Sequence, residues 1–156
     1  MTEETNKAAS VQEIAGFLRG EFSDKVNVTK TEERRVHAEV ERDSIHYVCE
    51  YIHEKLNFEH ATTVMGIDMV DHMEVVYLLS NYFTGVMIEL TVKLPAEDLH
   101  IRSVADIWGG ANWHERETYE LFGIIFDGHP KLERLLTPDT YEFYPFRKSY
   151  KLRGQE

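Results

Sequence analysis

The chain has 156 residues, the length of one globular domain, and 42% of them are hydrophobic, a composition typical of a protein that folds in water. Its 28 acidic and 17 basic residues give a formal charge of −11, which argues against nucleic acid or an anionic membrane surface as the main partner. No apolar run approaches the roughly 20 residues of a membrane-spanning helix, and the single cysteine, Cys49, excludes an internal disulfide or an all-cysteine metal site.

The first forty residues predict one helix followed by two strands. Residues 1–9 are polar and are predicted to be disordered. Ser10 and Glu13 have the spacing of a capping box, and apolar residues then recur at helical spacing as far as Phe22. Two short stretches of alternating apolar residues follow, and we expect strands at 26–28 and 36–40.

The next fifty residues predict a second helix and three strands. Apolar residues lie on one narrow face between Ile45 and Leu56, and Asp43 is placed to cap this helix. Alternating patterns then predict strands at 61–70, 73–79 and 86–92.

This order predicts an α+β fold: a two-layer, mostly antiparallel sheet with two helices on one face, followed by a short helix and an extended C-terminal arm. The other face of the sheet would carry Met87, Glu89, Thr91 and Lys93, a mixed surface that is a candidate for contact with a partner. We divide the chain into a disordered N-terminus (1–9), an α+β domain (10–110) and a signature helix with a subunit-binding arm (111–156).

The C-terminal third differs chemically from the rest. Residues 1–130 carry a net charge of −13 and residues 131–156 a net charge of +2, and 10 of the 18 aromatic residues lie between Trp108 and Tyr150. Asn112 and Glu115 are placed to cap a short helix that ends at Gly123. The tail holds spaced prolines and aromatics, a pattern that favours a protein interface over RNA stacking because the body is acidic.

Two clusters suggest chemistry within this chain. The helix from Trp113 carries several ionisable residues, and Glu115 or Glu117 could act as a general acid or base in a small hydrolase; the alternative is a charged helix that pairs with a partner, with Arg116 and Glu120 as an i,i+4 pair.

His46, Cys49 and His53 lie on one side of the second predicted helix and could bind a metal in a stand-alone sensor, although Cys49 also belongs to the apolar face. The sequence contains neither a Gly-rich phosphate loop nor a nucleophile elbow.

The C-terminal region also carries a long motif. The run Ala111–Pro130 reads ANWHERETYELFGIIFDGHP, with E-R-E followed by G-H-P, and residues 145–150 read PFRKSY, which fits P-x-R-K-x-Y. Residues 111–150 resemble the signature of the C subunit of the respiratory complex I family (the NADH-quinone oxidoreductase type). The compact length is similar to the archaeal version in the deazaflavin-coenzyme dehydrogenase of methanogens.

The resemblance implies a structural and assembly subunit with no cofactor, metal site or catalytic centre of its own. It would lie at the cytoplasmic face of the cell membrane, held there only through its complex, against a hydrogenase-like large subunit (D type) and iron–sulfur subunits (B and I types). Iron–sulfur clusters and flavin would belong to those partners. The complex would pass electrons from NADH or a reduced deazaflavin to a quinone or phenazine and translocate ions.

The residues expected at contacts between subunits come from the motif itself. Three of them, Asp127, His129 and Pro130, would fix the turn into the arm, and the basic ones would bind carboxylates of neighbouring subunits. The full set is Trp113, Glu115, Arg116, Glu117, Asp127, His129, Pro130, Arg134, Arg147, Lys148 and Tyr150.

Overall fold

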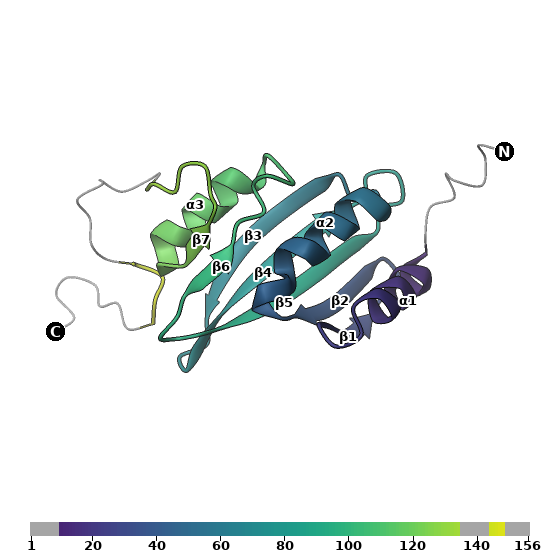
Figure 1. Cartoon of the computed structure of the whole chain (residues 1–156), viewed down its shortest axis with the longest axis horizontal. Helices are drawn as coiled ribbons and strands as arrows, with labels where there is room; N and C mark the ends of the chain where they lie inside the picture. The colour runs from purple at the N-terminus through teal and green to yellow at the C-terminus, as the bar shows by residue number, and fades with distance from the viewer. Residues whose placement is uncertain (1–9, 135–143, 149–156) are drawn as a thin grey trace.

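The computed structural model describes residues 10–134 and 144–148 and is built on a five-stranded sheet with the strand order β1-β2-β5-β4-β3. Helices α1 and α3 lie at opposite ends of this body and α2 lies across its middle (Figure 1). The elements in chain order are α1 Val11–Glu21, β1 Val26–Thr31, β2 Arg35–Val40, α2 Ile45–Lys55, β3 His60–Asp68, β4 His72–Ser80, β5 Met87–Pro95, β6 His100–Arg102, α3 Ala111–Phe122 and β7 Ile125–Asp127.

The sheet confirms the predicted α+β fold. Three of its four strand pairings are antiparallel, and β2 pairs with β5 in parallel. The parallel pairing was not predicted, because it arises only when the chain crosses through α2, β3 and β4 before β5 returns beside β2.

The two helices predicted from their apolar faces are present as α1 and α2. Ser10 caps α1 as predicted, since its hydroxyl accepts a hydrogen bond from the backbone N–H of Glu13 at 3.2 Å. The cap predicted for α2 is wrong: Asp43 lies within a 3₁₀ turn, Arg42–Ser44, and its side chain is 92% exposed beside Arg42. The turn itself leads the chain into α2, so no side-chain cap forms there.

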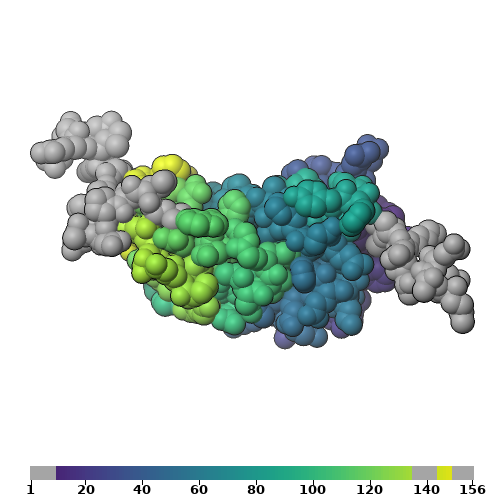
Figure 2. Space-filling model, turned by 90° about the horizontal axis from the view of Figure 1, so that it is seen from above, coloured from purple at the N-terminus to yellow at the C-terminus, as the bar shows by residue number. Residues whose placement is uncertain are grey.

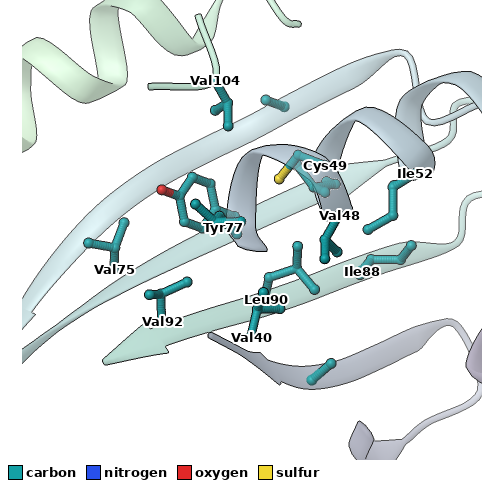
Figure 3. Close-up of a cluster of buried hydrophobic side chains, with 14 of the residues drawn as sticks. Val40, Val48, Cys49, Ile52, Val75, Tyr77, Ile88, Leu90, Val92 and Val104 are labelled. Carbon is teal, nitrogen blue, oxygen red and sulfur yellow. The ribbon is translucent and has the colours of Figure 1, made fainter. Parts of the chain in front are cut away.

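The core lies between α2 and the sheet (Figure 3). The buried stripe of α2, which includes Val48, Cys49 and Ile52, faces buried side chains of the central strands such as Tyr77 and Leu90. Burial raises the pKa of the Cys49 thiol, so this cysteine is an inert packing residue and not a thiolate ligand.

A third helix lies on the same face of the sheet as α1 and α2. Gly66 of β3 pairs with Val75, whose side chain belongs to the core under α2, and Gly66 is also the point at which Phe122 of α3 comes close. The sequence placed the short helix beyond the two-layer body, whereas the structure packs it against β3. Whether residues 10–110 and 111–156 act as separate units stays a prediction.

The other face of the sheet carries the predicted mixed set on β5, with Glu89 bonded to His37 of β2. Toward β3 the same face becomes apolar, because Val76 and Leu78 of β4 lie beside Met65, and β4 is therefore apolar on both faces.

Two short strands were not predicted. β6 and β7 pair in parallel, His100 with Ile125 and Arg102 with Asp127. Strands of three residues with more than twenty residues between them leave no periodic pattern.

Candidate functional site

The signature helix α3 spans Ala111–Phe122. Trp108 lies just before it, buried, with its indole N–H donating to the carbonyl of Phe58 at 2.9 Å. The helix starts at Ala111, two residues before the predicted start, and it has no side-chain cap, so the predicted capping by Asn112 and Glu115 is wrong. It ends as predicted, because Gly123 adopts a left-handed conformation with φ +78°.

The carboxyl group of Glu115 is used inside the chain. It is fully buried and accepts hydrogen bonds from the Ser103 hydroxyl at 2.6 Å and the Val104 backbone N–H at 2.8 Å. Burial raises its pKa from an ordinary 4.5 to about 7, while these two hydrogen bonds act in the opposite direction. Glu115 therefore joins α3 to the segment after β6, and it presents no surface to a neighbouring subunit.

The Gly-His-Pro turn is bonded to the start of α3. Gly128 has φ +83°, and the buried His129 ring donates from Nε2 to the carbonyl of Asn112 at 3.1 Å while Nδ1 accepts from the N–H of Lys131 at 2.9 Å. One donating and one accepting nitrogen describe a neutral imidazole, and burial lowers the pKa of His129 accordingly. These bonds hold the turn against the first residues of α3. Pro130, which follows His129, is exposed.

Asp127 ends β7 at the surface. Its carboxylate lies 3.0 Å from the imidazole of His100, and its carbonyl accepts from the N–H of Ser103 at 2.8 Å. The same residue thus closes the small β6–β7 sheet and leads into the turn.

Residues 144–148, here called the C-terminal strap, close the other end of α3. The N–H of Phe146 donates to the carbonyl of Leu121 at 3.0 Å, and Nε of Arg147 donates to the carbonyl of Phe122 at 2.6 Å. Carbonyls in the last turn of a helix have no partner within the helix, and a cation there also complements the helix dipole. The strap is therefore a C-terminal cap supplied by a distant part of the sequence.

The strap also contacts the sheet. The N–H of Lys148 donates to the Asp68 carboxylate at 2.7 Å, and this bond lowers the pKa of Asp68. The guanidinium of Arg147 lies 4.4 Å from the centre of the Tyr144 ring, and Arg134 approaches the same ring at 5.1 Å. The two arginines predicted to bind neighbours thus also hold this chain's own strap.

The outward side of α3 carries the remaining predicted residues. Trp113 is 58% exposed with the guanidinium of Arg116 at 5.1 Å from its ring, and Nε of Arg116 donates to the carbonyl of Glu133 at 3.1 Å. Glu117 and Lys148 are exposed. Tyr150 lies outside the described residues.

The two alternatives find no geometric support. His46 binds Asp106 at 2.9 Å and shares a small surface pocket with His53, which meets the Trp108 ring edge-on, but Cys49 is buried in the core, so the three do not meet at one site. Within residues 10–134 and 144–148, no group of three or more His, Cys, Asp or Glu side chains could hold a metal ion.

The two carboxylates proposed for a hydrolase also lie in different environments. Glu115 is enclosed by its own hydrogen-bond partners whereas Glu117 faces outward, so they do not share a concave site.

Two contacts that position α3 were missed in the sequence. The Thr118 hydroxyl donates to the carbonyl of Val64 at 3.1 Å, and a Cβ on Gly66 would lie 2.8 Å from the Phe122 ring. The glycine inside a strand was a usable signal, because such glycines mark the close approach of another element.

Comparison with known proteins identifies the family to which this chain belongs. The model of the family described as "Respiratory-chain NADH dehydrogenase, 30 Kd subunit" matches residues 38–156. The chain belongs to this family. It is therefore a C subunit of the complex I type, and its enzymatic role is that of one part of an oxidoreductase complex.

Relatives of this chain come from both archaea and bacteria. The C subunit of the F420H2 dehydrogenase of Methanosarcina mazei is 38% identical over 88% of this chain and 89% of its own length. The C subunit of the NADH-quinone oxidoreductase of Salinispora tropica is 39% identical over 96% of this chain, which spans only 62% of that protein. For its counterpart from Chloroherpeton thalassium the identity is 44% over 64% of this chain, and the share of that protein is 42%.

Two solved structures share the fold. One chain of the membrane-bound sulfane sulfur reductase, described as an archaeal respiratory membrane complex, superposes with a TM-score of 0.80 at 26% identity, covering 91% of this chain and 86% of that one. The trypsin-resistant fragment of Nqo5 superposes with a TM-score of 0.65 at 25% identity, covering 78% of this chain and 98% of the fragment. In the described part of the present chain, no helix is long and apolar enough to cross a membrane.

Proposed function

We propose that this chain is the structural and assembly subunit that holds the cofactor-bearing neighbours of its complex in register. Those neighbours are a hydrogenase-like large subunit of the D type and iron–sulfur subunits of the B and I types, with iron–sulfur clusters and flavin located in the partners. The chain lies on the cytoplasmic face and is attached to the membrane through the complex.

The observation that carries this proposal is the contrast between the two sides of α3. Inside, Glu115 and Thr118 bond the helix to the body; outside, Trp113 and Glu117 are exposed, and Arg116 is half-buried beside the Trp113 ring. Tryptophan and arginine are among the residue types that dominate binding energy at protein interfaces. Since electron tunnelling falls steeply with distance, a subunit that fixes the spacing of its neighbours contributes to electron transfer without a redox group.

The complex passes electrons from a reduced donor, NADH or reduced deazaflavin, to a quinone or phenazine and couples this to ion translocation. Relatives of both donor types are similar to this chain: the F420H2 dehydrogenase subunit from Methanosarcina mazei is 38% identical and the NADH-quinone oxidoreductase subunit from Salinispora tropica is 39% identical.

Affinity purification of the tagged chain from its native membranes in mild detergent tests the proposal, with mass spectrometry to identify the proteins that co-purify. We expect the large subunit and the iron–sulfur subunits, together with an input protein that identifies the donor. Recovery of the chain alone as a soluble monomer would overturn the proposal.

Arg116→Ala tests the surface itself. We expect less assembled complex, because an interface arginine that is removed leaves its partner carboxylate unpaired. Arg19→Ala is the matched control, since Arg19 is an exposed arginine on α1, and it should leave assembly unchanged. Equal amounts of active complex from Arg116→Ala and wild type would contradict the assignment of this residue.

A further inference from the structure

The loop that joins β4 to β5, residues 81–86, lies at the opposite end of β4 from the C-terminal strap. The register pairs Ser80 with His60 at the loop end and Met73 with Asp68 at the strap end. The teal atoms of the loop lie on the near face of the body in Figure 2, on the half of the molecule away from the yellow atoms of the strap. The loop belongs to none of the contacts described above.

One buried side chain builds this loop. The Asn81 amide oxygen accepts from the N–H groups of Phe83 at 2.9 Å and Thr84 at 3.3 Å, and its NH2 donates to the carbonyl of Asn57 at 3.2 Å. The Asn81 carbonyl also accepts from the N–H of Gly85 at 2.9 Å. The loop is thus bonded both within itself and to the end of α2, and its shape is set before any partner arrives.

The tip of this rigid loop is aromatic. The side chain of Phe83 is 92% exposed, and Tyr82 is 69% exposed with its ring stacked on His60 at 5.1 Å. Turns are formed mainly by Gly, Pro, Asn, Asp and Ser, so the geometry of this loop does not require the aromatic side chains at its tip. A preorganised aromatic side chain loses little conformational entropy on binding and is therefore an efficient anchor.

We propose that Phe83 is a second docking point of this subunit and inserts into an apolar pocket on another protein subunit of the same complex. The proposal rests on membership in the complex and does not depend on which partner contacts α3. With the strap at one end of β4 and the loop at the other, the chain would bridge two sites and fix their separation.

A protein pocket fits these surroundings better than a membrane. The turn between β1 and β2 lies beside the loop, since the N–H of Met87 donates to the carbonyl of Arg34 at 2.8 Å. That turn exposes Glu32 and Glu33 together with Arg34, whose guanidinium lies beside Gly85 of the loop, so the turn next to the aromatic tip carries both signs of charge. Membrane-inserting segments combine aromatics with a basic surface, whereas a mixed polar rim around an apolar centre is typical of protein interfaces.

Photo-cross-linking in the assembled complex tests this directly. Phe83 is replaced by p-benzoylphenylalanine, the purified complex is irradiated, and the products are identified by mass spectrometry; the same group in place of Phe17, an exposed phenylalanine on α1, measures background. We expect one covalent product that joins position 83 to another subunit. Products with lipid or detergent alone, or no product from an intact complex, would overturn the inference.

A substitution measures the strength of the contact. Phe83→Ser removes a side chain with almost no contacts inside this chain, so the fold should persist, and thermal unfolding of the isolated variant verifies this. We expect the chain to dissociate from the purified complex about tenfold faster or more, against less than twofold for Phe17→Ser. Equal rates for the two variants would contradict the inference, whereas failure of the wild-type chain to assemble would contradict the proposed function instead.

Discussion

Helices α2 and α3 have 11 and 12 residues and lie on the same face of the sheet, but they are held by different interactions. α2 packs through an apolar stripe that includes Val48 and Ile52. α3 also buries Ala111 and Phe122, and it is held in addition by hydrogen bonds of buried polar groups, with Glu115 to the segment after β6 and Thr118 to β3. Buried hydrogen bonds thus position α3 in addition to its apolar contacts.

Apolar contacts and hydrogen bonds differ in how strongly they depend on orientation. Apolar contacts tolerate small shifts and rotations as long as area stays buried, whereas a hydrogen bond to a buried carboxylate weakens steeply when its angle changes. α3 is thus fixed in rotation, which determines the direction of Trp113 and Arg116 on its outer side. This suits a helix whose outer residues must meet a partner.

The largest expected effect is on the apolar helix. Ile52→Ala should lower the free energy of unfolding by about 2–5 kcal/mol, because the side chain is fully buried and its removal leaves a cavity. Urea unfolding of the purified chain measures this. Ile67→Ala on the open face of the sheet, where the side chain is 38% exposed, should cost about 1 kcal/mol; equal losses would mean that α2 packs loosely.

The polar helix should differ in its pH dependence. Burial raises the pKa of Glu115 to about 7, so the folded chain holds this proton more tightly than the unfolded chain. Its contribution is fully present below about pH 4.5 and is lost as the pH rises through about 7, a change of up to about 3 kcal/mol.

Urea unfolding of wild type and Glu115→Gln across this range isolates that contribution, because the variant keeps every other titrating group. We expect wild type to lose stability relative to the variant as the pH rises from 4.5 to 7. If the unfolding free energies of the two proteins changed with pH in parallel, the pKa of Glu115 would not be raised by folding, and its carboxyl group would be accessible to water.

The close approach of α3 to β3 predicts a smaller loss. Gly66→Ala places a methyl group 2.8 Å from the Phe122 ring, which must move together with its helix, and we expect a cost of about 1–3 kcal/mol. Gly16→Ala in α1 meets nothing within 4 Å and should stabilise by about 0.5–1 kcal/mol. If both substitutions stabilise, α3 does not rest on Gly66.

The smallest effect concerns a single hydrogen bond. Thr118→Val keeps the shape of the side chain but leaves the Val64 carbonyl without its hydroxyl donor, and thermal unfolding should show a loss of about 1 kcal/mol. Thr29→Val removes an exposed bond to the carbonyl of His37 and should change stability by less than about 0.5 kcal/mol. If the two variants lost the same stability, the hydrogen bond of Thr118 would contribute no more to holding α3 than an exposed bond does.

Much of the fold could be predicted because its elements are periodic. The helix beginning after Ser10, the apolar face of α2 and the alternating strands β3, β4 and β5 each repeat a pattern within a few residues. Caps were less predictable: Asp43 and Asn112 have the right chemistry, but the chain enters α2 and α3 through turns that make a cap unnecessary.

The candidate site could be found in the sequence but not described from it. The E-R-E and G-H-P residues were recognised as a unit, yet the two glutamates of E-R-E have opposite environments, with Glu115 enclosed and Glu117 exposed. Nothing in their spacing distinguishes them, because α3 lacks a wide apolar stripe that would mark its inner side.

By itself the sequence determined the family, the order of the main elements and the long motif from Ala111, because these depend on residue types at short spacing. Only the tertiary structure decided that the Glu115 carboxyl group lies inside, that Arg147 caps α3 from another part of the chain and that Phe83 stands at the tip of a rigid loop. The first two depend on contacts between residues 11 or more positions apart, and the loop around Phe83 combines bonds within itself with the bond from Asn81 to Asn57. Burial and hydrogen-bond geometry at such contacts exist only after folding.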